Sequence, residues 1–200
     1  MWTYTIPSNI LLIYQLDACS MASWLMLHFL RRYGNMSKIV NNPDVVSAEA
    51  QVNRDQIEHR ATWMGLMYDE MRKAGVQNAE DIVRKAIKRC GSMHGGRFLE
   101  RCKDPKDVQE FAKVFLNDVG KASFHMNNIE ADENKLHISF NYCALCNAWQ
   151  KLGFDDETCS KLCDMAMDGD RGIADAMGLK LDLSDTIAKG KPTCELVFYK

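Results

Sequence analysis

Hydrophobic residues recur every three or four positions between about Val52 and Ala74, which predicts the clearest helix of the chain. One apolar stripe along it consists of Ile57, Ala61, Met64, Tyr68 and Met71. A second stripe, on the opposite side, consists of His59, Trp63, Leu66 and Glu70. Because a helix that is apolar on two sides is usually packed between other elements, we expect this helix to be central and to end at Gly75.

Shorter periodic segments on either side predict further helices. Residues 21–33 form an amphipathic pattern ahead of the central helix. Another helix is expected to begin with Asn78 as its N-cap and to stop at Gly91, before the loop "GSMHGG". Asp104 followed by Pro105 predicts the start of a fourth helix. The expected buried face of that helix consists of Val108, Phe111, Phe115 and Val119.

From Lys121 onward the period of the pattern changes to two, which is typical of strands. The segments "ASFHMNNIE" and "KLHISFNY" predict one hairpin, and "LKLDLSDTIA" and "TCELVFYK" predict a second. Between the hairpins, residues 143–163 predict two short helices broken at Gly153, and residues 167–178 predict a turn and another short helix. The fold class is therefore α+β: a helical N-terminal half packed on a small antiparallel sheet of two hairpins with inserted helices.

Length and composition fit one domain with an extension. Of the 200 residues, 46% are hydrophobic and 26% are charged, so the chain can bury a core and shows no signature of disorder. We expect residues 1–50 to be a partly helical N-terminal extension and residues 51–200 to be a single α+β domain. Within that domain, residues 51–120 are expected to be helical and residues 121–200 to carry the sheet with its inserted helices.

The charge balance bears on the partners of the protein. The net charge of −2 gives no basic footprint, which argues against a nucleic-acid partner. The chain also has no block of like charge for a membrane surface to attract. A small-molecule substrate is the partner that we expect, and a homo-oligomer is possible.

Cysteine usage bears on the compartment. A chain of this length can fold without disulfide bonds, so its eight cysteines and twelve methionines favour a reduced cytoplasm. Export is the alternative, because "NILLIYQL" precedes "DACS" and Cys19 could then be a lipidated residue. The segment lacks the positively charged region that begins a signal peptide, and we expect a cytoplasmic protein.

Four of the cysteines form two pairs, Cys143/Cys146 and Cys159/Cys163, whose spacing resembles that of a zinc site. Both pairs lie in segments whose pattern predicts helices, among apolar residues. They lack the glycine or proline between the paired cysteines that is typical of zinc knuckles. In that context cysteine behaves as a small hydrophobic residue. We expect these thiols mainly to pack in the core, with no metal and no cofactor; zinc and a disulfide are the alternatives.

Other positions carry candidate chemistry. His59 shares a helical stripe with Trp63, and the alternative to a catalytic role is a hydrogen-bonded interior histidine. His94, in the expected loop "GSMHGG", is free to point into a cleft or into solvent. In "DGDRG", Asp170 and Arg171 can hold a cationic and an anionic group, or can be a helix cap and a surface arginine.

Several segments together resemble the L-2-amino-thiazoline-4-carboxylic acid hydrolase family over about residues 50–200. They are "IEHRATWMGLMYDEMRKAG", "CGSMHG", "NYCALCNAWQKLG", "GDRGIADAMGLKLDL" and "TIAKGKPTCELVF". The closing stretch also resembles 4-vinyl-reductase-type small-molecule-binding domains. The resemblance implies a hydrolase that opens a small cyclic amidine, such as the aminothiazoline acid, to an N-carbamoyl-cysteine. A non-catalytic domain that senses a small ligand or a metal is the alternative.

The resemblance also implies site residues: Cys143, Asp170 and Cys194 match the family's pattern, and His59, Arg60 and His94 match helical motifs of this branch. The candidate catalytic residues are Asp170, Cys143, Cys194, His94 and His59. The candidate substrate-binding residues are Arg60, Arg171 and Trp63. Asp170 would hold the cationic amidine, Arg171 the substrate carboxylate, and a thiol of lowered pKa would be a possible nucleophile. We expect these groups to meet between the helical half and the sheet.

Overall fold

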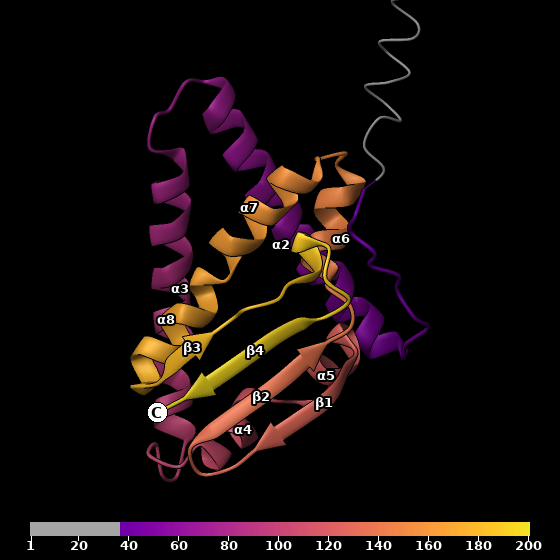
Figure 1. Ribbon diagram of the computed structural model, residues 1–200. Helices are drawn as coiled ribbons and strands as arrows, with labels where there is room; N and C mark the ends of the chain where they lie inside the picture. The colour runs from indigo at the N-terminus through magenta and orange to yellow at the C-terminus, as the bar shows by residue number, and fades with distance from the viewer. Residues whose placement is uncertain (1–36) are drawn as a thin grey trace, which may run out of the picture. The chain divides into compact units, whose positions relative to one another are not determined.

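The helical half of the protein is built on α2 (Ala48–Lys73), the first element that the computed structural model describes (Figure 1). The helix ends before Gly75, whose φ of 73° lies in the left-handed region that glycine tolerates best. The first apolar stripe is confirmed, because Ile57 and Tyr68 are buried. The expectation for the second stripe was wrong: Trp63 is 61% exposed, so α2 buries only one side.

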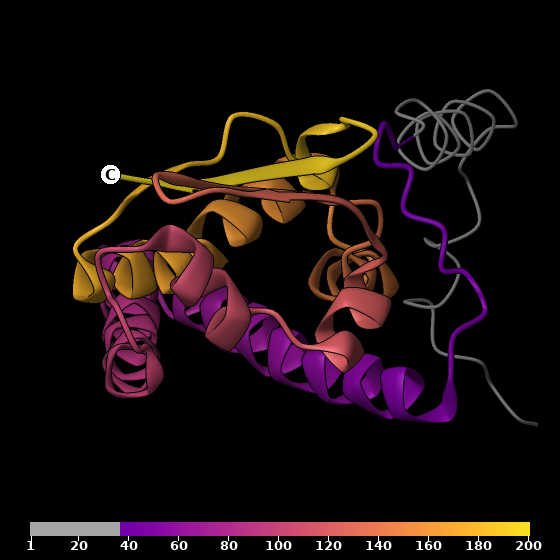
Figure 2. The same ribbon diagram turned by 90° about the horizontal axis from the view of Figure 1, so that it is seen from below.

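The described residues are 37–200, and the helix expected over residues 21–33 lies outside them. Residues 38–200 form one folded unit. Within it, the helices lie on one side of the sheet, which is seen edge-on in Figure 2. No helix in this part of the chain has both the length and the hydropathy that crossing a bilayer requires.

Helix α3 (Ala79–Arg101) continues without interruption through the segment that was expected to be a loop. Gly91 does not stop it, because Gly91 and Gly95 allow α3 to approach another helix, α8 (Asp168–Met177), very closely. A Cβ atom at Gly91 would lie 1.9 Å from the carbonyl oxygen of Gly169, and one at Gly172 would lie 2.3 Å from the carbonyl oxygen of Lys88. The glycines are therefore packing residues, and His94 lies on a helix.

The other helices are α4 (Val108–Phe115), α5 (Asp118–Phe124), α6 (Ala144–Lys151) and α7 (Asp156–Ala166). Helix α4 begins later than Asp104-Pro105 predicted, because Asp107 is its cap and accepts a hydrogen bond from the Gln109 amide (2.8 Å). Helix α7 is capped by Asp155, which accepts a hydrogen bond from the Thr158 amide (2.8 Å).

Helix α5 occupies residues 118–124, the end of which was expected to begin a strand. Asn117 caps this helix by accepting a hydrogen bond from the Gly120 amide (2.8 Å). Arg54 of α2, which is buried, donates from Nε to the carbonyl oxygen of Ser123 (2.8 Å). Capping and this tertiary contact outweigh the strand-like pattern of the segment.

The sheet consists of β1 (Met126–Ala131), β2 (Lys135–Phe140), β3 (Lys180–Asp182) and β4 (Cys194–Tyr199). Its order is β1-β2-β4-β3 with antiparallel neighbours, which confirms the α+β class with an antiparallel sheet of two hairpins. β3 is shorter than expected: residues 183–186 have no regular structure, and a 3₁₀ turn, η2 (Ile187–Lys189), follows them. Leu136 and Phe198 are fully buried on the inner face, where Phe198 contacts Phe111 of α4 at a ring distance of 5.1 Å.

Candidate functional site

A cavity of about 940 Å³ lies between the helices and the inner face of the sheet. Its walls come from α2, α3 and α8, from the ends of β2 and β4, and from the start of α6. Most of the lining is apolar. Within the described part of the chain, the ionisable lining residues other than cysteines are Arg60, Glu70, His94, Tyr142 and Asp170.

The fold brings together five of the residues that the sequence singled out. Arg60, His94, Cys143, Asp170 and Cys194 all line the cavity, although they come from five different segments of the chain. The predicted meeting place, between the helical half and the sheet, is where the cavity lies. The catalytic and binding roles of these residues stay predictions.

Asp170 is the third residue of α8, so it is not the residue that caps the helix. No other side chain in residues 37–200 forms a hydrogen bond or an ion pair with its carboxylate, which accepts a hydrogen bond from its own backbone N–H. Burial raises the pKa of Asp170 to about 6, against the opposing effect of the Arg60 and Arg171 charges. Desolvation thus outweighs the favourable field of the helix N-terminus, and about half of the carboxyl groups are neutral at pH 6.

Arg60 lies on the first apolar side of α2 and reaches the cavity at its edge. Among the described residues its guanidinium forms no hydrogen bond and no ion pair. Its charge lowers the pKa of both Asp170 and Cys143, which places it within electrostatic range of each. His94, on α3, lines the same cavity one turn after Gly91.

The cavity thiols are held by backbone amides. Cys143 is the N-cap of α6, where its Sγ accepts a hydrogen bond from the Cys146 amide (3.5 Å). The Sγ of Cys194 accepts one from the Ile187 amide (3.2 Å). Burial nevertheless raises the pKa of both thiols, and no histidine lowers it. Each is therefore a neutral thiol at pH 7, which does not suit a nucleophile.

The other cysteines of the 143–163 segment pack in the core. Cys146 and Cys159 are fully buried, and Cys163 is buried at the cavity wall. Burial raises the pKa of Cys159 to about 11 and that of Cys163 to about 12. All cysteines in the described residues are free thiols, and no three His, Cys, Asp or Glu side chains among them are placed to hold a metal ion.

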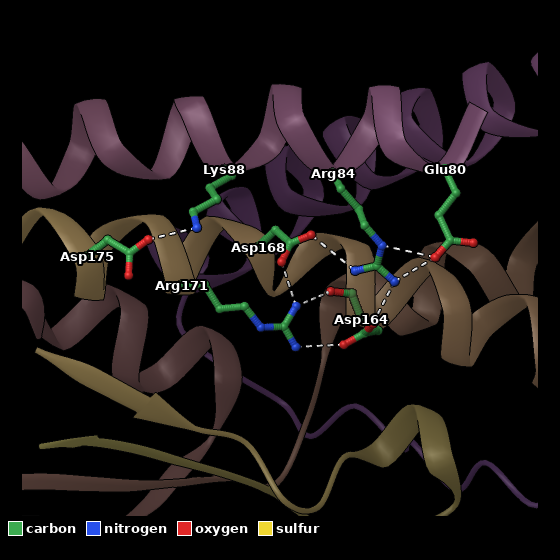
Figure 3. Close-up of polar contacts among 7 residues, drawn as sticks. All are labelled: Glu80, Arg84, Lys88, Asp164, Asp168, Arg171 and Asp175. Atoms are coloured by element: carbon green, nitrogen blue, oxygen red, sulfur yellow. Dashed lines mark hydrogen bonds and ion pairs between the residues drawn. The ribbon is translucent and has the colours of Figure 1, made fainter. Parts of the chain in front are cut away.

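Arg171 does not line the cavity and belongs to an ion-pair network that joins α3, α7 and α8 (Figure 3). Its guanidinium contacts Asp164 (2.7 Å) and Asp168 (2.6 Å), and Arg84 of α3 contacts the same two carboxylates (2.6 and 3.1 Å). Asp168 is buried, so this network fixes the position of α8 against its neighbours. Arg171 acts on Asp170 only through its charge.

His59 and Trp63 lie outside the cavity lining, on the exposed side of α2. Their rings contact each other edge to face at 5.2 Å. Both were candidate site residues by resemblance, and the structure places neither of them at the cavity.

A family model described as L-2-amino-thiazoline-4-carboxylic acid hydrolase matches residues 54–198. The chain belongs to this family. The matched residues run from α2 to β4 and include the walls of the cavity. No curated protein and no solved structure matches the chain. The further resemblance to 4-vinyl-reductase-type domains is not borne out.

The sequence did not reveal the apolar wall of this family member's cavity. Met64, Met67 and Met71 of α2 face Ile82 and Val83 of α3 across it. The periodicity predicts Met64 and Met71 as core residues. Side chains that line a cavity and side chains that fill a core recur at the same helical spacing, so the pattern alone does not distinguish them. A methionine-rich stripe beside a buried stripe was the available signal, because methionine is common on surfaces that accept varied ligands.

Proposed function

We propose that this protein hydrolyses a small cyclic amidine, such as L-2-amino-thiazoline-4-carboxylate, to an N-carbamoyl-cysteine product. One observation carries the proposal: the Asp170 carboxylate faces an apolar cavity without a side-chain partner among the described residues. Such a group is suited to hold a cationic amidine, because an ion pair is strong where water is scarce. The family membership supports the same reaction class.

Asp170 has two tasks in the proposed reaction. Its carboxylate accepts hydrogen bonds from the amidinium N–H groups and so favours the charged, electrophilic form of the ring. Water adds to the carbon between sulfur and nitrogen, and Asp170 takes the proton from that water. The C–S bond then breaks as the oxygen loses its second proton and the C=O bond forms. The proton held by Asp170 passes to the departing sulfur, and the second proton is released to solvent, which removes the positive charge that the amidinium brought. A pKa of about 6 suits this base, because it is largely ionised at neutral pH.

Arg60 is the proposed partner of the substrate carboxylate. It replaces Arg171, whose guanidinium is engaged by Asp164 and Asp168. A free guanidinium at the cavity edge can form a forked pair with a carboxylate. His94 is kept as a second candidate for proton transfer. The neutral thiols of Cys143 and Cys194 favour direct attack by water over a covalent thiol intermediate.

The second candidate function is non-catalytic binding of a small ligand. Two observations favour it: the thiols are not activated, and most of the cavity wall is apolar. Both candidates need a ligand in the same place, so only chemistry on the bound ligand separates them.

Thiol release from the aminothiazoline acid tests the proposal directly. Purified full-length protein is expected to release thiol in proportion to enzyme concentration, with N-carbamoyl-cysteine identified by mass spectrometry. The same ring without its carboxylate is the matched substrate control, and its KM should be higher because Arg60 loses its partner. Release no faster than in buffer, together with measurable binding, would reject the hydrolase in favour of the binding domain.

The rate should depend on pH through Asp170. The base form exists above its pKa of about 6, so kcat/KM is expected to be constant near pH 7 to 8. Below pH 6 it should fall about tenfold per pH unit, as the carboxylate gains a proton. Initial rates from pH 4.5 to 8 measure this, with circular dichroism to show that the protein stays folded. A profile that is flat through pH 6 would remove Asp170 as the base.

A further inference from the structure

We propose that the substrate or ligand of this site is amphipathic. Its charged head lies at Asp170, and an apolar group extends between α2 and α3 toward the turn that joins them. The identity of the head rests on the proposed function, whereas the apolar group rests on the cavity alone.

The first argument is size. A volume of about 940 Å³ lies at the upper end of the range for pockets that bury drug-sized ligands, roughly 300–1,000 Å³. The aminothiazoline acid is one small ring with an amino group and a carboxylate. It would leave most of this volume to water against an apolar wall. A ligand with an added apolar group would remove that wall from water, which is the main source of binding free energy in such sites.

The second argument is the distribution of charge along the cavity. Arg60 and His94 lie on the parts of α2 and α3 that are far from the connecting turn, and Asp170 is within electrostatic range of Arg60. From Arg60 to Met71 the lining of α2 covers roughly 16 Å at 1.5 Å per residue. Beyond the charged end, the part of the cavity between α2 and α3 is lined by methionine, isoleucine, valine and alanine side chains, with Glu70 at its edge.

The third argument is access. Met67 and Ile82 line the cavity and are 57% and 43% exposed, so the apolar end opens to solvent between α2 and α3. Glu70, the acidic residue at this end, is engaged by Lys73 (2.7 Å). A long apolar group can therefore enter from this side while the head meets Asp170. Flexible methionine side chains suit a wall that adapts to such a group.

A homologous series of linear alkyl amidines, from acetamidine to octanamidine, tests the proposal by calorimetry on the full chain. Affinity is expected to rise about three- to fourfold for each added methylene until the apolar end is filled. Neutral primary alkyl amides of equal length should bind at least tenfold more weakly at pH 7, because they have the shape of the amidines but no charge to pair with Asp170. An affinity that does not change with chain length would contradict the proposed apolar group of the ligand. That holds whether water, another segment or a second copy of the chain occupies the apolar end of the cavity.

Variants at the cavity mouth give a matched comparison. Met67→Gln and Ile82→Gln should flatten the dependence on chain length, because each replaces apolar wall by an amide. Leu66→Gln and Met93→Gln are the controls: these residues lie on the same two helices, are 42% and 60% exposed, and do not line the cavity. The controls should keep the wild-type dependence, and equal effects in all four variants would count against the proposed location.

Failure of this inference can be distinguished from failure of the proposed function. Turnover of the aminothiazoline acid without any effect of alkyl chain length on affinity would support the hydrolase and contradict the proposed apolar group of the ligand. A clear effect of alkyl chain length on affinity, without turnover of any cyclic amidine, would support the amphipathic ligand and contradict the hydrolase. Equal affinity for amidines and neutral amides would contradict the assignment of the head to Asp170.

Discussion

Gly91→Ala is expected to lower the free energy of unfolding by about 3 kcal/mol or more. The added Cβ would lie 1.9 Å from the carbonyl oxygen of Gly169 and 2.8 Å from its Cα atom, and both are backbone atoms that cannot rotate away. Helices α3 and α8 must therefore separate. The cost exceeds the gain of about 1 kcal/mol that alanine brings to a helix in place of glycine. Urea denaturation measures the change.

Gly96→Ala is the matched control. Gly96 lies on the same helix, and a Cβ atom there would have no neighbour within 4 Å. This variant should be more stable than wild type by about 0.5–1 kcal/mol, because only the helix propensity changes. Equal effects of the two substitutions would mean that α3 and α8 do not pack through their glycines. In that case the placement of His94 and Asp170 around the cavity would also be in question.

The same glycines show where sequence reasoning reached its limit. A glycine inside a helical pattern usually weakens the helix, so Gly91 predicts an end and "GSMHGG" predicts a loop. In the structure Gly91 lies inside the helix and allows close packing instead of ending it. The reason is the partner helix α8, whose Gly169 and Gly172 supply the complementary surface from a distant part of the sequence. Local helix propensity can be predicted from one segment of the sequence. A close crossing of two helices depends on two segments and on how the fold pairs them.

Patterns whose physical cause is local were predicted well. The alternation in β2 places Leu136 and Ile138 in the core, and the two short helices α6 and α7 lie on either side of Gly153 as expected. The second stripe of α2 failed for a different reason. Trp63 is large and apolar, but apolar residues also occupy surfaces, and periodicity cannot say which side of a helix is covered.

The candidate site was predictable as far as residue chemistry was concerned. Asp170, Cys143 and Cys194 were selected by resemblance, and the fold does bring them to one cavity. Their protonation was not predictable, because it depends on burial. A thiol of lowered pKa was considered as a nucleophile, but desolvation raises the pKa of Cys143, Cys194 and Asp170 alike. The engagement of Arg171 by Asp164 was equally invisible, because it joins two helices.

Asp170→Asn should lower turnover by two or more orders of magnitude, the loss that follows removal of one group that stabilises charge at a reacting centre. Asparagine has nearly the same shape, but it can neither pair with an amidinium nor take a proton from water. Asp175→Asn is the control on the same helix. Asp175 is exposed and pairs with Lys88 (2.8 Å) outside the cavity, so its loss should leave turnover unchanged.

The same substitution should raise stability, which separates a functional carboxylate from a structural one. Folding raises the pKa of Asp170 from 3.8 to about 6, so the native state favours the neutral form. The cost of burying the ionised group is absent below about pH 4, where the carboxyl is neutral in both states, and it grows as the pH rises toward 6. At pH 7 it amounts to about 1–3 kcal/mol, which the uncharged asparagine side chain does not incur. The unfolding free energy of the Asp170→Asn variant should therefore exceed that of wild type at pH 7, and the difference should shrink toward pH 4. A variant that is less stable at pH 7 would show that the carboxylate holds the fold together. A variant that is folded and fully active would place the reaction elsewhere.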